Sequence, residues 1–466
     1  MNNISKRSLL INFFNNYSKF IIAWFIFCLV FLFTYWAHPS LSPKISPDGY
    51  GYWSIAENFT SSIDDASIRP WFYPIFIRIC MIISLNHWQI ILSLFQIFFH
   101  SSVCILMYYL FRKYGLNGFS SFVCTLIIGF NPNLITYTTY ILADLNFAIL
   151  TTLAWYFVLK INERDNWNYR SIVFASLFCA LALFTKPIAL FMIFTFLISI
   201  YMVKGFSYNF IKISIFMLII NYSLFFSWKV FQSFQDSNPA MSQPFFLRAG
   251  AINWTAIKSG YVDIGDGTPL YNRLKELGKI EKARSLNLDL TYTMDESSDF
   301  VDVYRSIGGD VLYLGDQEFA KKIIKEMPIE IILLSLAKWH SFFTKRCFFP
   351  SNDPFPGMID FIRKTYIKFY SYLYRPLLLI FLISSLIILY KKQYLNLLYC
   401  SFSLLLYASL IVTLGTGHSG EFIRYRVWVE YVMWFIALLP FGIVLEKVFI
   451  GLNKTKKIIY NYNIGK

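Results

Sequence analysis

The sequence predicts an all-α protein that crosses a membrane many times. Of its 466 residues, 56% are hydrophobic and only 15% are charged, whereas a soluble protein carries about 25% charged residues. Apolar runs of about 20 residues, the length that a helix needs to span a bilayer, recur along the chain. The formal charge of +15 comes from short lysine and arginine clusters between these runs, which is typical of topology signals. The composition therefore argues against a soluble class and does not indicate a nucleic-acid partner.

The apolar runs predict about ten transmembrane helices. These lie near residues 20–36, 88–111, 119–137, 144–160, 171–185, 188–203, 212–231, 370–390, 395–415 and 427–449. The first run is aromatic and lacks a small-residue cleavage site, so we predict a retained anchor and not a signal peptide. The seven cysteines fall mostly inside the runs with no CxxC spacing, which predicts core residues and neither disulfides nor a metal site.

The loop charges predict the topology. Every second loop is basic if both termini are cytoplasmic, as the positive-inside rule requires. Three segments then face the outside: residues 38–87, about 232–369, and 415–426. We accordingly divide the chain into a transmembrane catalytic module (1–231, with the first outer loop 38–87), an outer region with a juxtamembrane helix (232–369), and C-terminal helices with a basic tail (370–466).

The first outer loop contains an acid and a cation at the membrane boundary. Asp48 opens a predicted short amphipathic helix in which Tyr52, Ile55, Ala56 and Phe59 follow at helical spacing. The simpler interpretation of Asp48 is a helix N-cap. Arg69 begins a stiff aromatic turn that continues to Pro74. An acid and a guanidinium held together at the surface would suit transfer from a phosphate-linked substrate.

Two further charges interrupt apolar runs at the predicted outer boundary. Asp144 begins the fourth span among apolar neighbours, so its carboxylate needs a partner or a polar cavity unless it is only a cap. Lys186 precedes a proline between two apolar helices. It is either a snorkelling lysine or an anion-binding group on the side that is otherwise poor in cations.

A last cluster precedes the final span. Glu421, Arg424, Arg426 and Glu430 lie there, with His418 close by. The spacing fits equally a salt-bridged rim, which would contribute little energy, and an arginine clamp for a phosphate.

These residues follow the order of a known family's motifs. The matching elements are Asp48-x-x-x-Tyr52-x-x-Ile55-Ala56-x-Asn58, Arg69-Pro70-x-x-Tyr73-Pro74, Asp144, the Leu-Phe-Thr-Lys-Pro element from Leu183 to Pro187, and Arg-Tyr-Arg from Arg424 to Arg426. Together they resemble the polyprenyl-phosphate-dependent glycosyltransferases of the GT-C fold, a group that includes the lipid A aminoarabinose transferases and the protein O-mannosyltransferases. The likeness covers about the first half of the chain and the last span.

Two departures from the family pattern concern the subfamily. A second acidic residue often follows the first, whereas Gly49 stands here, and Trp71 replaces the second proline of a common Pro-Pro pair.

The resemblance implies a GT-C membrane fold with a small periplasmic subdomain, in a bacterial inner membrane, with the active site facing the periplasm. It implies inverting transfer of a sugar from a polyprenyl-phosphate donor to a cell-envelope acceptor of the lipopolysaccharide, O-antigen or lipid A type. Asp48 would be the base and Asp144 would assist it or orient a substrate. The donor phosphate would contact Arg69, Lys186, Arg424 and Arg426, and substrates would contact Tyr52, Tyr73, Glu421 and His418. No metal is required, although two aspartates in one cleft would suit Mg²⁺ or Mn²⁺.

Two other functions stay open. A polysaccharide polymerase of the O-antigen type would share many spans and a large outer loop, but would use a diphosphate-linked oligosaccharide. A transporter would show charges near the midplane of several helices and paired, interrupted spans, whereas here the charges gather at the outer boundary.

Overall fold

The computed structural model describes most of the membrane part of the chain. The described residues are 2–37, 43, 45, 47–58, 69–163, 166–233, 358–391, 394–415 and 421–443, with isolated residues between 275 and 342 and residue 446. Within these ranges the regular elements are helices, without a strand, which confirms the all-α prediction. They are α1 (Asn2–Ala37), α2 (Pro47–Glu57), α4 (Phe72–Ile83), α5 (Trp88–Lys113), α6 (Gly118–Gly129), α7 (Pro132–Thr138), α8 (Asp144–Asn162), α9 (Tyr169–Leu183), η1 (Pro187–Ala189), α10 (Met192–Lys204), α11 (Tyr208–Ser233), α19 (Met358–Lys391), α20 (Leu395–Gly415), α21 (Glu421–Arg426) and η3 (Val427–Val429).

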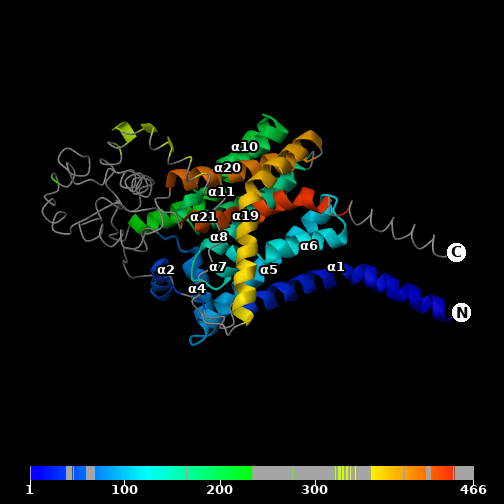
Figure 1. Cartoon of the computed structure of the whole chain (residues 1–466). Helices are drawn as coiled ribbons and strands as arrows, with labels where there is room; N and C mark the ends of the chain where they lie inside the picture. The colour runs from blue at the N-terminus through cyan, green and yellow to red at the C-terminus, as the bar shows by residue number, and fades with distance from the viewer. Residues whose placement is uncertain are drawn as a thin grey trace.

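Several of these helices are long and apolar enough to cross a membrane. Six meet this measure by length and composition, or seven if the bent pair α6 and α7 forms one span. Each of the ten predicted runs overlaps a helix, and the helix that begins at α21 continues through η3 to residue 443. α2, α4 and α21 lie at one end of the bundle, whereas the N-terminal end of α1 lies at the other (Figure 1).

The first outer segment differs from its prediction because it contains a second helix. α2 begins at Pro47, as the Pro-Asp start signal indicates. The predicted turn from Arg69 to Pro74, however, becomes the start of α4, which packs against α2 and α5. Pro74 is compatible with this helix because it lies in the first turn, where its missing N–H has no helical partner.

The predicted span 119–137 is also corrected, because it is two helices bent by 57°. Asn131 caps α7 by accepting a hydrogen bond from the backbone N–H of Asn133 at 2.9 Å, and Pro132 occupies the first helical position. This Asn-Pro pair is a helix start signal.

The carbonyls that lose their helical partners at this bend are bonded by side chains. Tyr370 donates to Ile127 O at 2.8 Å, and Tyr366 donates to Phe130 O. The Nε2 atom of His100 lies 3.0 Å from Gly129 O, and it must carry the proton because a carbonyl only accepts. An irregular backbone at membrane depth is tolerated where protein groups bond it in this way.

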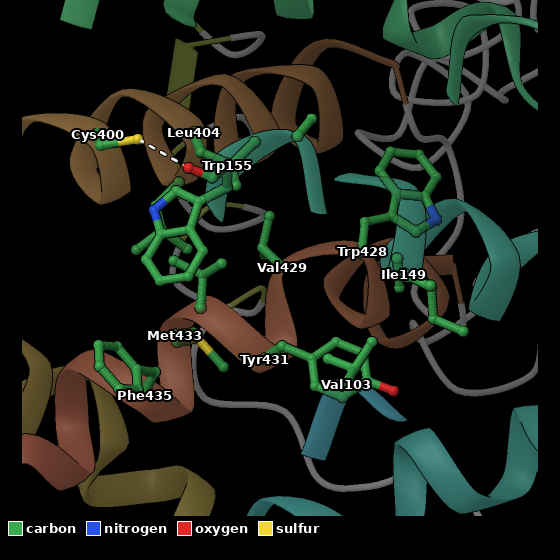
Figure 2. Close-up of a cluster of buried hydrophobic side chains, with 14 of the residues drawn as sticks. Val103, Ile149, Trp155, Cys400, Leu404, Trp428, Val429, Tyr431, Met433 and Phe435 are labelled. Atoms are coloured by element: carbon green, nitrogen blue, oxygen red, sulfur yellow. Dashed lines mark hydrogen bonds between the residues drawn. The ribbon is translucent and has the colours of Figure 1, made fainter. Parts of the chain in front are cut away.

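The final span forms the centre of the core. Most of Arg424–Ile443 is buried inside the bundle. Figure 2 shows Val429, Met433 and Phe435 of this span beside Trp155 of α8 and Cys400 of α20. The indole of Trp155 donates to Ser401 Oγ at 3.1 Å, as a buried polar tip requires.

The predicted outer region, 232–369, lies largely outside the described residues. Its isolated described residues between Lys321 and Phe342 are helical, within the run where a juxtamembrane helix was predicted.

Candidate functional site

A fully buried carboxylate joins three parts of the chain. Asp144 is 0% exposed. Its Oδ1 atom lies 2.6 Å from Lys186 Nζ, and its Oδ2 atom lies 3.0 Å from Arg424 Nε. The indole N–H of Trp428 donates to Oδ1 at 3.1 Å. We call these four residues the Asp144 cluster, and three of them were singled out from the sequence as separate candidates.

The local structure explains why these side chains meet. Asp144 is the first residue of α8, where the helix dipole favours a negative charge. Lys186 lies in the turn between α9 and η1, and Pro187 begins the 3-10 helix that follows. Arg424 and Trp428 are four residues apart on the last span, so they project from one side of it.

The Asp144 cluster brings two cations together. One carboxylate faces both Lys186 and Arg424. The side chain of Lys186 is 8% exposed, whereas that of Arg424 is 21% exposed. The cluster is therefore reachable from the Arg424 side, and its two cations suit an anionic group such as a phosphate.

The turn that carries Arg69 is joined to the turn that carries Lys186. The backbone N–H of Phe72 donates to Phe184 O at 3.2 Å. Arg69 lies three residues before this bond and Lys186 two residues after it, so the two cations belong to neighbouring segments. The Arg69 guanidinium also lies over the ring of Tyr52, with Cζ 5.5 Å from the ring centroid.

The rings of Tyr52 and Tyr73 pack together beside Arg69. Both are buried, and their rings meet edge to face with centroids 5.2 Å apart. The Tyr73 hydroxyl donates to Gln96 Oε1 at 3.2 Å, and the Gln96 amide donates to Thr138 O at 2.8 Å and to Tyr140 O at 3.3 Å. Gln96 thus connects α4 to the loop that leads into Asp144.

Arg426 lies in a different cluster, deeper in the bundle. It is 0% exposed, and its Nε atom donates to Glu430 Oε1 at 2.9 Å. Its Nη1 atom donates to Phe342 O at 3.2 Å, and its guanidinium lies 4.0 Å from the centroid of the Tyr374 ring. These contacts do not favour the donor-phosphate role that was predicted for Arg426.

Glu430 accepts hydrogen bonds from five side chains, and we call these residues the Glu430 cluster. Its donors are Arg426, Asn131, Asn133, Tyr374 and Trp434. Arg426 balances its charge, and both residues are 0% exposed. The cluster therefore joins the bend before α7, α19 and the last span, and it is closed to solvent.

The remaining predicted residues are placed only by their backbone or not at all. Asp48 lies in the first turn of α2 and Glu421 begins α21, but their side chains lie outside the described part of the chain, as does His418. Their predicted roles stay predictions.

The divalent cation predicted between two aspartates stays a prediction, because the side chain of Asp48 lies outside the described residues. Both oxygens of Asp144 accept hydrogen bonds, from Lys186, Arg424 and Trp428. Among the described residues no group of three or more His, Cys, Asp or Glu side chains could hold a metal ion.

Sequence reasoning missed Trp428 and Gln96. Trp428 follows Arg424 by four residues, so helical spacing would have placed both on the same face. Gln96 lies near the middle of a predicted span, and a polar group in such a position needs a buried partner.

Comparisons with known proteins agree with the motifs. The model of the family described as dolichyl-phosphate-mannose-protein mannosyltransferase matches residues 82–236, about a third of the chain, which includes Asp144 and Lys186. A search of curated proteins found no match.

Two solved structures of ArnT from Cupriavidus metallidurans also align with the chain. The apo structure is 12% identical with a TM-score of 0.36, and the alignment covers 89% of this chain and 76% of ArnT. The structure bound to undecaprenyl phosphate is 12% identical with a TM-score of 0.37, and the alignment covers 90% and 77%. Over residues 82–236 the chain is therefore similar to the dolichyl-phosphate-mannose-protein mannosyltransferases, which confirms the resemblance that the motifs predicted.

Proposed function

We propose that this protein is an integral-membrane inverting glycosyltransferase that moves a sugar from a polyprenyl-phosphate donor to a cell-envelope acceptor. The single observation that carries the proposal is the Asp144 cluster, in which Lys186 and Arg424 lie together beside one carboxylate at a partly exposed position. The family match over residues 82–236 supports the same reaction class.

The cations act on the leaving group. When the bond between the anomeric carbon and the phosphate oxygen breaks, the lipid phosphate gains one negative charge. Lys186 and Arg424 are positioned before the reaction, so they stabilise this charge without reorganisation. Arg69, on the neighbouring turn, adds a planar guanidinium that suits a phosphate. In this proposal, the isoprenoid tail of the donor lies among the apolar spans.

Asp48 is the proposed base. It removes the proton of the acceptor hydroxyl as that oxygen forms its bond to the anomeric carbon, opposite the departing phosphate. Inversion at that carbon follows from the opposite-face attack. Asp48 and Tyr52 are four residues apart on α2, so they share a helix face, and Arg69 lies over Tyr52.

Asp144 is a positioning residue in this scheme. Its two oxygens accept hydrogen bonds from Lys186 and Arg424, and so fix where these two cations lie. Arg426 likewise positions the last span through Glu430. We therefore assign phosphate binding to Arg69, Lys186 and Arg424.

The proposed acceptor is a lipopolysaccharide, O-antigen or lipid A component at the periplasmic face of a bacterial inner membrane. Its selection is assigned to the outer region, 232–369, with Tyr73, Glu421 and His418 as proposed substrate contacts.

The base is tested by Asp48→Asn in the purified full chain. We expect transfer from a polyprenyl-phosphate sugar to fall by about 10²–10⁴-fold, the usual contribution of general base catalysis. Glu57→Gln is the matched control, because Glu57 is exposed at the other end of the same helix. Near-normal transfer by the folded Asp48→Asn variant would contradict the proposal.

The donor is tested in the same assay with monophosphate-linked and diphosphate-linked sugars. We expect only the monophosphate-linked donor to be consumed. Consumption of the diphosphate-linked oligosaccharide alone would indicate the polymerase function instead.

A further inference from the structure

Gly51 lies unusually close to the Arg69 guanidinium. A Cβ atom placed on Gly51 would lie 2.8 Å from both Cζ and Nη1 of Arg69 and 3.0 Å from its Nε. These distances are shorter than non-bonded carbon contacts allow, since favourable contacts lie at about 3.5–4.0 Å. The guanidinium therefore occupies the space that any larger residue at position 51 would need.

Other contacts hold the guanidinium against this surface of α2. It lies over the ring of Tyr52, the residue next to Gly51. Pro70, which follows Arg69, is buried, and the nearby Phe72 amide is bonded to Phe184 O. The guanidinium thus lies against α2, and the backbone three residues after Arg69 is bonded to the turn that carries Lys186.

The register of α2 relates this position to Asp48. Asp48 precedes Gly51 by three residues and Tyr52 by four. Residues at these spacings share one face of a helix. The Arg69 guanidinium therefore lies about one helical turn along α2 from the position of Asp48, on the same face of the helix.

We propose that Gly51 is a positioning residue that sets how closely the Arg69 guanidinium approaches α2, and so where the lipid phosphate meets the proposed base. This inference rests on the proposed function for the role of Arg69. The close packing of the Arg69 guanidinium against Gly51, which we call the seat, is a structural property. A side chain at position 51 would push the guanidinium away from α2 and separate the phosphate from the helix face of Asp48.

The test is a double-mutant cycle of Gly51→Ala and Arg69→Ala in the full-length protein. Alanine is normally the better residue inside a helix, so Gly51→Ala alone should raise the melting temperature if space were available. The guanidinium is the far end of a flexible side chain and can move aside, so we expect the gain to be small or absent in the wild-type background. In the Arg69→Ala background, where the guanidinium is gone, the same substitution should raise the melting temperature by more.

Transfer activity is measured on the same four proteins. We expect Gly51→Ala to lower kcat/KM for the polyprenyl-phosphate donor by at least about tenfold, a loss of 1.4 kcal/mol in transition-state stabilisation, with no further loss when it is added to Arg69→Ala. Gly118→Ala is the control, because the nearest atom to its added Cβ would be Tyr108 Oη at 3.8 Å, an ordinary contact.

The outcomes separate this inference from the proposed function. An equal effect of Gly51→Ala on the melting temperature in both backgrounds would overturn the close packing of Arg69 against Gly51. Full transfer by Gly51→Ala beside a defective Arg69→Ala would overturn its positioning role. If the wild type transferred no sugar, the proposed function would fail, while a larger gain in melting temperature in the Arg69→Ala background would still support the close packing.

Discussion

The last span takes part in two buried ion clusters that differ in charge balance and in access. In the Asp144 cluster, one carboxylate faces Lys186 and Arg424, and the Arg424 side chain is 21% exposed. In the Glu430 cluster, one carboxylate faces Arg426, and both are 0% exposed. The first cluster has two cations beside one carboxylate and is partly exposed, whereas the second has one cation beside one carboxylate and is fully buried.

This difference shows how to separate a binding site from a structural joint. A buried ion pair of one carboxylate and one cation that is closed to solvent offers a ligand little to bind, and breaking it leaves an uncompensated charge. An unbalanced cluster can accept an ion of the missing sign. The two arginines, Arg424 and Arg426, are only two residues apart, yet they fall on opposite sides of this distinction.

The largest expected effect is on folding, from Glu430→Gln. This substitution leaves Arg426 buried without a counter-charge, which typically costs about 3–5 kcal/mol. We expect a large fall in the unfolding midpoint of the detergent-solubilised protein. Glu163→Gln is the control, since Glu163 is partly exposed and its partner Lys113 is 46% exposed, so this pair should contribute about 1 kcal/mol or less. Equal unfolding midpoints for the two variants would contradict a structural role for the Glu430 cluster.

The next effect is on activity, from Lys186→Met. Asp144 keeps Arg424 and Trp428 in this variant, so the fold should survive. Loss of one preorganised charge at the leaving group should lower kcat by about 10²–10³-fold. Lys160→Met serves as the control, because Lys160 lies at the other end of α8, over the ring of Tyr156. Unchanged kcat in the Lys186→Met protein would show that the cluster does not act on the phosphate.

The smallest effect compares one substitution in both clusters. Trp428 donates to Asp144 at 3.1 Å and Trp434 donates to Glu430 at 3.0 Å, so Trp→Phe removes one hydrogen bond to a carboxylate in each case. Each variant should lose about 1.5–3 kcal/mol of stability. Only Trp428→Phe should also change the KM for the donor, because Asp144 would then hold its cations less precisely. We expect a change of about two- to fivefold, where tenfold corresponds to 1.4 kcal/mol. A similar KM change in Trp434→Phe would remove the distinction between the clusters.

The sequence was informative where a charged residue interrupts an apolar run. Asp144, Lys186 and Arg424 were each identifiable because an ionised group at the membrane boundary needs a partner or a function. That the three are partners of one another was not predictable, because they lie on separate helices far apart in the chain and only the packing brings them together.

Other features were missed for different physical reasons. α4 carries no long apolar run, so a 12-residue helix resembled a turn with an aromatic end. The bend before α7 was marked by Asn131 and Pro132, but the apolar run on either side of this pair concealed it. Arg426 could not be distinguished from Arg424 by sequence, because its role depends on Glu430 and on contacts from α19.

The capped bend between α6 and α7 has a mechanical consequence. Its three freed carbonyls are bonded by groups from two other helices, His100 of α5 and Tyr366 and Tyr370 of α19. Lifting α19 from the bundle would strip two of these bonds at a cost of several kcal/mol for each bared carbonyl. The bend and α19 therefore move together. A displacement of α19 also moves the segment that leads from the bend to Asp144.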